Sequence, residues 1–325
     1  MIIEKHILQL EDNLKQHIKH LFPKHNFSQI YHYALFPPGK LFRPQLAVAT
    51  AKDLSPADTS FAELMEIQHP VALLASALEL HHVYTLLHDD LPCMDNDDWR
   101  RDKLATHKKY GEWQALLAGD GLLNSSYQLL AKINHPNLGR LLKVTTWALG
   151  PKGLIQGQVL DLSASDKFDF IQLKKTHQLK TARLIQVAII GSMLLTEDTN
   201  SSSLRPFLDL YKLGNGVGIV FQLLDDLSEL EQDSISSHEL AANGWINYPI
   251  ESMDETLKTL SRVHQLLLRY QMKNLKITIG HYFELMRSKI EKSQDSITDH
   301  LVKTGNCKSF DLGPVVVALN RIQGH

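Results

Sequence analysis

Residues 70–90, "PVALLASALELHHVYTLLHDD", limit how this chain can fold more than any other stretch. Pro70 is suited to the first turn of a helix, and the residues after it are apolar on nearly every face of a 3.6-residue period. A helix of this kind cannot lie on the protein surface, because it has no polar face to turn toward water. The stretch therefore predicts a helix in the middle of a large bundle, covered by other helices on all sides.

Other long segments carry the same helical period, and convincing strand alternation is nearly absent. Further helical segments are expected at residues 4–22, 39–54, 111–133, 136–162, 170–195, 205–230 and 255–290. Gly214, Gly216 and Gly218 lower helix propensity within one of them but allow close approach of another backbone. No low-complexity linker divides the chain. The pattern predicts a single all-α domain over residues 1–325, built from about ten or more helices.

The composition is that of a globular protein with a sizeable core, since 43% of the residues are hydrophobic and 22% are charged. A net charge of −2 argues against a nucleic-acid or membrane-surface binder. We expect no membrane span, because no uninterrupted apolar run approaches about 18 to 20 residues. The two cysteines, Cys93 and Cys307, form no C-x-x-C pattern. A reducing cytoplasmic location is therefore expected.

Carboxylates crowd the end of the apolar stretch, in "LLHDDLPCMDNDDWRR" at residues 86–101. On an unbroken helix Asp89 and Asp95 would lie roughly 240° apart and could not serve one site. Pro92 cannot continue the helical hydrogen bonding, and it moves its predecessor out of the α region. The helix should therefore end near Asp90, so that the following residues fold back and bring Asp95 to the acidic pair.

A second apolar helix also ends in carboxylates, in "FQLLDDLSEL" at residues 221–230. Asp225 and Glu229 are four residues apart and share a helical face, with Asp226 beside them. Two such helix ends pointing into one cavity would supply hard oxygen ligands. Mg²⁺ prefers such ligands and commonly binds through carboxylates together with substrate phosphates.

Basic residues follow the first acidic motif and stand in two separate pieces of the sequence, and arginine forks and lysine point charges bind diphosphates. They are Lys40, Arg43, Arg100, Arg101 and Lys180. The joint pattern indicates two polyanionic substrates, one held through metal ions and one held directly by cations.

Six pieces stand in a fixed order over roughly residues 39–230: "GKLFRP", "ELHHVYTLLHDDLPCMDNDDWRR", "LAGDGLL", "GQVLDL", "LKT" and "FQLLDDLSE". On these residues the chain resembles the trans-isoprenyl diphosphate synthases (the polyprenyl synthetase family), in particular their bacterial farnesyl-forming members. The resemblance implies an isoprenoid synthase fold around a deep central cavity, and a homodimer. It also implies Mg²⁺-dependent condensation of dimethylallyl or geranyl diphosphate with isopentenyl diphosphate, by ionisation, condensation and elimination.

The resemblance also implies roles for individual residues. The acidic residues expected to hold about three Mg²⁺ ions are Asp89, Asp90, Asp95, Asp225, Asp226 and Glu229. The residues expected to contact the allylic diphosphate are Arg100 and Lys180. Those expected to hold isopentenyl diphosphate are Lys40, Arg43, His82 and Arg101. Those expected along the path of the allylic cation are Thr181, Gln158 and Gln222.

Product length is expected to depend on the helix wall below Asp89. Tyr84 and Thr85 lie five and four residues before it, about one helical turn deeper. An aromatic side chain at Tyr84 resembles the farnesyl-forming pattern, in which it would form the floor of the product cavity. The motif "LPCMDNDD" also resembles geranylgeranyl-forming members, so the product length stays open.

Two features depart from the family pattern. The second motif ends in Glu229, where D-D-x-x-D is usual, and "GWINYP" (244–249) places Trp245 where a lysine is expected. Trp245 lies in the polar stretch 231–247, which we interpret as a loop. One lost charge-assisted contact is worth about 1.5–3 kcal/mol. Two alternatives therefore remain. One is a synthase of another chain length, and the other is a weakened homologue that acts as a binding subunit. A terpene cyclase would not need the cations Lys40 and Arg43.

Overall fold

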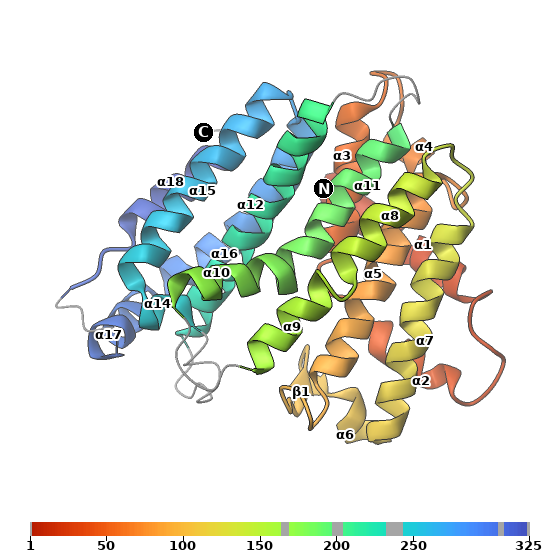
Figure 1. Cartoon of the computed structure of the whole chain (residues 1–325), viewed down its shortest axis with the longest axis horizontal. Helices are drawn as coiled ribbons and strands as arrows, with labels where there is room; N and C mark the ends of the chain where they lie inside the picture. Colours follow the sequence, from red (N-terminus) through yellow and green to blue (C-terminus); the bar gives the residue numbers. More distant parts are fainter. Residues whose placement is uncertain (1, 164–168, 197–203, 232–242, 305–308, 324–325) are drawn as a thin grey trace. The chain divides into compact units, whose positions relative to one another are not determined.

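The computed structural model describes residues 2–163, 169–196, 204–231, 243–304 and 309–323 (Figure 1). By its internal contacts the chain forms two compact units. The first unit comprises Met1–Leu142 and Gly191–Ser201, and the second comprises Lys143–Ile190 and Ser202–His325. Two of the boundaries between the units fall inside helices α8 (Leu138–Leu149) and α11 (Arg183–Thr196).

The first unit is built around α5 (Pro70–Asp89), which packs on α7 (Glu112–Ala131), α3 (Phe42–Leu54) and α1 (Ile2–Ile18). Most side chains of α5 from Val71 to Leu87 are buried, as its all-round apolar sequence predicts. The remaining elements are α2 (Ser28–Leu35), α4 (Phe61–Leu64), α6 (Thr106–Tyr110) and an antiparallel hairpin of β1 (Trp99–Arg100) and β2 (Lys103–Leu104).

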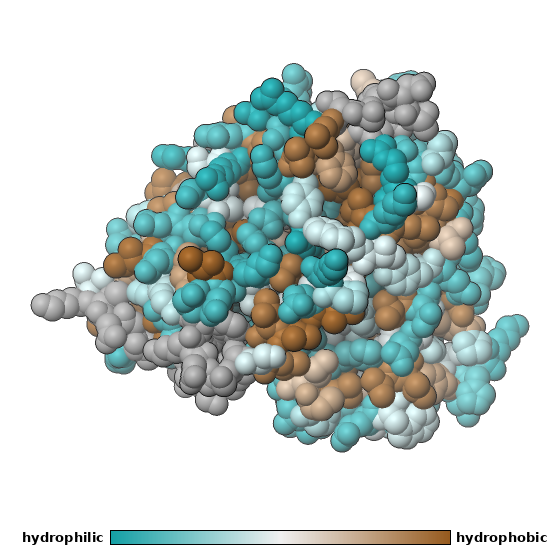
Figure 2. All heavy atoms as spheres, viewed as in Figure 1, coloured by the Kyte–Doolittle hydropathy of each residue, from teal (hydrophilic) through white to brown (hydrophobic). Residues whose placement is uncertain are grey.

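The second unit is built around α12 (Leu204–Glu229), which packs on α15 (Pro249–Arg269) and α16 (Lys273–Lys292). Helix α12 also contacts a π-helical turn, η1 (Gln178–Ala182), which joins α10 (Phe170–His177) to α11. The other helices are α9 (Leu154–Leu162), α14 (Gly244–Asn247), α17 (Gln294–Thr304) and α18 (Gly313–Gln323). Apolar side chains gather on the surface of α9, where Ile155 and Val159 are exposed (Figure 2).

Glycines in α12 allow the close helix packing that their sequence predicts. A Cβ atom on Gly218 would lie 2.3 Å from the Cβ of Ala182 in the π-helical turn. A Cβ atom on Gly214 would lie 3.0 Å from the Cα of Gln186 in α11. Both distances are too short for a larger side chain, so these glycines let α12 lie directly against the backbone of the neighbouring segment.

The all-α class is confirmed, because the regular secondary structure of the described residues is helical apart from the short β1–β2 hairpin. The segment 136–162 forms two helices, α8 and α9, and the segment 170–195 is interrupted by the π-helical turn. The single domain over 1–325 and the deep central cavity stay predictions.

Two helical stretches are long and apolar enough to cross a membrane by length and composition alone, a test that buried core helices also pass. They are Pro70–Asp89 and Phe170–Thr196. Of the apolar window in each, 78% and 89% is buried inside the protein. Burial of this extent is typical of core helices in a bundle.

Candidate functional site

The first acidic motif lies where α5 ends and the chain turns back. The helix ends at Asp89, and Asp90 is its C-cap. The backbone N–H of Asp95 donates to the carbonyl oxygen of Asp89 at 2.9 Å, while Met94 and Asn96 both donate to Leu91. Asp95 thus returns to the helix end, and the chain reversal expected from Pro92 is confirmed.

Asp90 is already bound to a cation of the same segment. Arg100 donates to Asp90 Oδ1 from Nε at 2.9 Å and from Nη2 at 2.5 Å, and Nη2 also lies 2.6 Å from Asp97 Oδ2. Asp90 is buried, and burial raises the pKa of its carboxyl, while the Arg100 guanidinium lowers it. The motif therefore holds an internal ion pair between a predicted metal ligand and a predicted diphosphate ligand.

Arg101 occupies a strained position in the turn of the β1–β2 hairpin. Its φ is +54° and that of Asp102 is +61°, the left-handed region that residues other than glycine rarely adopt. Lys103 fixes the hairpin by donating to the carbonyl oxygens of Tyr33 and Phe36, and Tyr33 donates its hydroxyl to the carbonyl of Leu104 at 2.7 Å. Strain of this kind is often kept at functional sites.

Three of the residues predicted to hold isopentenyl diphosphate lie close enough for their charges to interact. His82 is partly buried on α5, and its pKa is well below the usual range because of burial and the nearby charges of Arg43 and Arg101. A neutral His82 beside two guanidiniums forms a basic site within the first unit. The fourth residue, Lys40, accepts a hydrogen bond from Gln45 at its backbone carbonyl, 2.6 Å away, and the role of its side chain stays a prediction.

The two residues predicted to control product length have different surroundings. Tyr84 is buried, with its ring edge-on to those of His81 and His88 at centroid distances of 4.6 and 5.6 Å. His88 lies against Gly119 of α7, so Tyr84 belongs to the packed layer between α5 and α7. Burial raises the pKa of the Tyr84 phenol to about 12. Thr85 donates its hydroxyl to the carbonyl of His82 at 2.8 Å.

In the second unit the predicted residues form a chain of hydrogen bonds. Thr181, in the π-helical turn, donates to Gln222 Oε1 at 2.8 Å, and Gln222 donates from Nε2 to Asp226 Oδ1 at 2.8 Å. The turn also packs closely on α9, where a Cβ on Gly157 would lie 2.3 Å from the backbone nitrogen of Lys180. Single π-helical turns within α-helices occur often at functional sites.

Two residues that we did not single out from the sequence belong to the same cluster. Lys180 donates to Asp161 Oδ2 at 2.5 Å, and His177 Nε2 lies 3.6 Å from Asp226 Oδ2. Asp161 is the acidic residue of "GQVLDL", so the motif itself carried the signal. Gln158 of that motif lies on α9, and its buried side-chain nitrogen has no hydrogen-bond partner among the described residues.

The second acidic motif contains a buried carboxylate whose charge is poorly compensated. Asp226 is 5% exposed, and its Oδ2 has no hydrogen-bond partner among the described residues. Burial raises the pKa of this carboxyl well above its usual value. The hydrogen bond from Gln222 and the backbone of Gly244 lower the pKa, while the charges of Glu229 and Asp225 raise it further. A carboxylate oxygen of this kind fits a Mg²⁺ ligand.

No three His, Cys, Asp or Glu side chains of the described residues are grouped closely enough to hold a metal ion by themselves. Mg²⁺ usually keeps water ligands and shares the rest between a few carboxylates and substrate phosphates.

Trp245 lies in the protein core and not in a surface loop. It is fully buried in α14, and its indole Nε1 donates to the carbonyl oxygen of Leu223 at 2.6 Å. Asn243 caps α14 and donates to the carbonyl of Asp226 at 2.7 Å. The loop expected at 231–247 was thus wrong for Gly244–Asn247, where packing on α12 stabilises a helix, and residues 232–242 lie outside the described residues.

A cation from a distant part of the chain reaches the end of α12. Lys289 of α16 donates to Ser228 Oγ at 3.3 Å, and its Nζ lies 3.9 Å from Glu231. Lys289 therefore places a positive charge near the end of α12, although position 245 of the sequence is a tryptophan and not a lysine.

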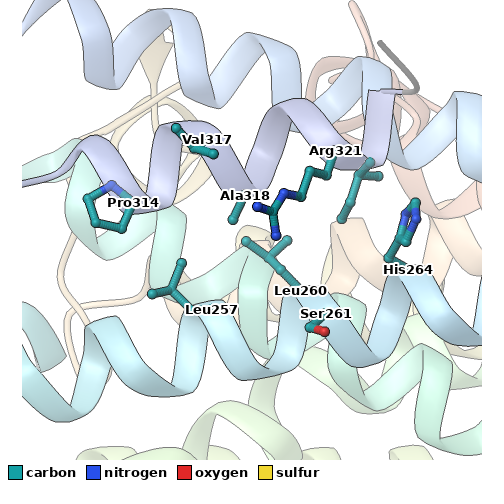
Figure 3. Close-up of a pocket in the computed structure, with 9 residues that line it drawn as sticks. Leu257, Leu260, Ser261, His264, Pro314, Val317, Ala318 and Arg321 are labelled. Carbon is teal, nitrogen blue, oxygen red and sulfur yellow. The ribbon is translucent and has the colours of Figure 1, made fainter.

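A separate cavity of about 370 Å³ lies between α15 and α18, away from both acidic motifs in sequence (Figure 3). Its walls are mainly apolar, including Leu257, Leu260 and Val317, with Arg321 and His264 on opposite helices. No carboxylate is among its lining residues, so it lacks the ligands for magnesium and diphosphate chemistry.

The polyprenyl synthetase family model matches residues 24–239, which include both acidic motifs and every residue with a predicted role. The chain belongs to this family. Among relatives, it is 30% identical over 251 residues to the farnesyl diphosphate synthase of Buchnera aphidicola, covering 75% of this chain and 84% of the relative. The cavity between α15 and α18 lies outside the part matched by the polyprenyl synthetase family model.

Solved structures of similar fold include geranyltransferases. The enzyme from Legionella pneumophila has a TM-score of 0.73 and 28% identity, covering 91% of this chain and 97% of that one. A Helicobacter pylori geranyltransferase complexed with magnesium and isoprenyl diphosphate also has a TM-score of 0.73 and 28% identity, covering 87% and 97%. The isoprenoid synthase fold expected for a polyprenyl synthetase is thus confirmed.

Proposed function

We propose that this member of the polyprenyl synthetase family is a short-chain trans-prenyltransferase that condenses an allylic diphosphate with isopentenyl diphosphate to give farnesyl diphosphate. The names of its relatives support this reaction class. The observation that carries the proposal is the buried end of α12. There Asp226 joins Gln222 and Thr181 through two hydrogen bonds of 2.8 Å, and one of its carboxylate oxygens has no hydrogen-bond partner in the part of the chain that the structure describes.

The acidic residues proposed to hold Mg²⁺ are Asp89, Asp90, Asp95, Asp225, Asp226 and Glu229. Bound Mg²⁺ would neutralise the diphosphate oxygens and assist departure of the leaving group. The unpartnered oxygen of Asp226 supports this assignment from the second motif, and the return of Asp95 to the end of α5 supports it from the first.

Each cation predicted to bind the allylic diphosphate is now paired with a carboxylate. Arg100 is paired with Asp90, and Lys180 is paired with Asp161 at 2.5 Å. Such pairs hold a cation in place and neutralise a buried carboxylate before substrate binds. On binding, Arg100 and Lys180 would turn from these carboxylates to the diphosphate oxygens, where charge develops during ionisation.

The remaining residues act on the carbocation and on the second substrate. Oxygen atoms of Thr181, Gln222 and Gln158 would line the path of the allylic cation, which needs an environment free of water. The double bond of isopentenyl diphosphate attacks C1 of the allylic cation, and the proton then lost goes to the departed diphosphate. The residues proposed to hold isopentenyl diphosphate are Lys40, Arg43, His82 and Arg101.

A direct assay tests this function. Purified protein is incubated with Mg²⁺, labelled isopentenyl diphosphate, and either dimethylallyl or geranyl diphosphate, and product length is read by chromatography. We expect a fifteen-carbon product that disappears when EDTA removes the metal. The absence of any prenyl product with every allylic primer would overturn the proposal.

The burial of Trp245 favours a second candidate, a weakened homologue that binds substrates without efficient turnover. A lysine at position 245 would not reach a diphosphate, because the side chain at this position points into the core. Calorimetric binding of geranyl diphosphate with Mg²⁺ but no measurable turnover would support this candidate. A product of a different chain length would instead support the other alternative within the family.

We further propose a homodimer, because one face of α7 exposes large apolar side chains. Trp113, Leu116 and Leu117 are 61%, 44% and 49% exposed. Sedimentation equilibrium tests this, and a monomer at micromolar concentration would contradict it.

The cytoplasmic location stays a prediction. Cys93 is exposed and free, and Cys307 lies outside the described residues.

A further inference from the structure

A buried glutamate lies behind the basic residues of the first unit. Glu79 is on α5, one turn before His82, and is 2% exposed. Its Oε1 is 4.0 Å from Nη2 of Arg101. Burial raises the pKa of this carboxyl, while the charges of Arg101 and Arg43 lower it. A glutamate is almost never fully buried unless cations compensate it, so these two arginines explain why Glu79 is tolerated here.

The guanidinium of Arg101 is confined from a second side. A Cβ atom on Gly39 would lie 2.9 Å from Nη2 and 3.0 Å from Cζ of Arg101. The backbone of Gly39 therefore forms one wall of the space that this guanidinium occupies, and the carboxylate of Glu79 attracts it from α5. The left-handed φ of +54° at Arg101 belongs to the two-residue turn of the β1–β2 hairpin, in which both central residues adopt positive φ.

The arrangement addresses an electrostatic difficulty of this site. Arg43 and Arg101 both act on Glu79 and on His82, so two guanidiniums share one partly buried region. Like charges in such surroundings repel strongly. Neutral His82 cannot compensate them. The carboxylate of Glu79 acts on both Arg43 and Arg101 before an anion arrives, and Asp90 also acts on Arg101.

We propose that Glu79 is a positioning residue, which holds the guanidiniums of Arg43 and Arg101 in place to receive the diphosphate of the isopentenyl substrate. The inference rests on the proposed function. Glu79 does not contact the diphosphate itself, because two anions would repel. Two cations against one carboxylate leave a net positive charge toward the substrate, so the carboxylate fixes the arginines without cancelling their attraction.

Substitution of Glu79 tests the role through a difference between the two substrates. Glu79→Gln keeps the size of the side chain and removes its charge. We expect the KM for isopentenyl diphosphate to rise about tenfold, or about 1.4 kcal/mol. The KM for geranyl diphosphate and the kcat should change less than about twofold. Glu79→Asp, which keeps the charge, should recover part of the loss.

Two further variants separate positioning from general stability. Gly39→Ala should raise the same KM selectively, because the added methyl group displaces the Arg101 guanidinium. Glu255→Gln is the matched control, since Glu255 is also largely buried and paired with a cation, Lys174 at 3.2 Å. It should leave both KM values unchanged. Thermal unfolding of each variant shows whether it is folded.

The outcomes distinguish the positioning role from the proposed function. Equal effects of Glu79→Gln on both KM values, or tighter binding of isopentenyl diphosphate, would overturn the positioning role. A wild-type protein that makes no prenyl product overturns the proposed function instead. In that case, calorimetric titration with inorganic pyrophosphate in the absence of metal tests the positioning role of Glu79. Weaker binding by Glu79→Gln than by wild type would support the positioning role, and equal binding would overturn it.

Discussion

The indole N–H of Trp245 donates a hydrogen bond to the backbone carbonyl oxygen of Leu223, across 2.6 Å. Leu223 lies two residues before the acidic pair of α12, and the ring of Trp245 packs edge-on to Phe310 at 6.1 Å. The residue that stands where the family pattern has a lysine therefore fixes the acidic helix from within the core.

Replacing Trp245 by lysine should not restore a diphosphate contact. Trp245→Lys should lower the free energy of unfolding by about 3–5 kcal/mol, because it leaves a cavity and buries a charge. Trp245→Phe keeps most of the volume and should lose about 1–3 kcal/mol, since the carbonyl of Leu223 is left without its donor. Urea unfolding measures both values. A stable Trp245→Lys variant with increased prenyltransferase activity would contradict the core role.

Asp226→Asn should make the protein more stable and less responsive to metal. The buried oxygen Oδ2 has no hydrogen-bond partner among the described residues, and Asp225 and Glu229 add repulsion. Removing the charge should raise the free energy of unfolding by about 1–2 kcal/mol. Mg²⁺ with inorganic pyrophosphate should raise the Tm of wild type but not of this variant. The exposed Asp254→Asn is the control, and an equal Tm rise in all three proteins would contradict the assignment.

Tyr84→Ala should lengthen the product if this side chain is the floor of the cavity. Removing the ring would open space between α5 and α7, which His81 and His88 line. Chromatography should then show products beyond fifteen carbons. Tyr84→Phe keeps the ring and should leave the product unchanged. Identical product lengths in Tyr84→Ala and wild type would reject the role.

Gly218→Ala and Gly139→Ala should have opposite effects. At Gly218 the new methyl group would lie 2.3 Å from the Cβ of Ala182, next to Thr181, so the variant should lose about 1–3 kcal/mol and much of its activity. Gly139 is exposed in α8 with nothing within 4 Å of an added Cβ, so alanine should stabilise by about 0.5–1 kcal/mol. Urea unfolding compares the two, and equal effects would show that α12 packs less tightly than described.

His81 should make the stability of the protein depend on pH. Burial lowers its pKa from 6.5 to about 3, so the folded state keeps this residue neutral. The stability it contributes is complete above pH 6.5 and is lost as the pH falls toward 3, because the unfolded state takes up the proton first. In His81→Gln this loss is absent. The difference in unfolding free energy between wild type and variant should therefore change by about 2 kcal/mol between pH 6.5 and 5. Unfolding free energies of wild type and His81→Gln that change in parallel with pH would contradict this role of His81.

The local features that depend on short stretches were predictable from the sequence. The buried α5, its end at the acidic pair and the return of Asp95 all follow from apolar periodicity and Pro92. The pairing of Arg100 with Asp90 did not follow, because it depends on the path of the hairpin. Nor did the burial of Trp245, which depends on packing between α14 and α12.

Buried charges account for most of the site residues that sequence reasoning missed. Glu79 stands in an apolar helix within the quoted "ELHH", and Asp161 stands within "GQVLDL". Each is tolerated because a cation from another segment compensates it: Arg101 for Glu79, and Lys180 for Asp161. Periodicity alone identifies neither partner, since both pairs join residues from different elements.

The π-helical turn at Gln178–Ala182 changes how the whole segment from α10 to α11 must be compared with other helices. A π turn takes in one residue more than an α turn, so every position after it is displaced by about 100° around the axis. A helical wheel drawn through residues 170–196 would thus place the buried faces of α10 and α11 out of phase. Alignments with proteins whose helix is regular here need a one-residue gap, without which Lys180 and Thr181 would be matched to the wrong side chains.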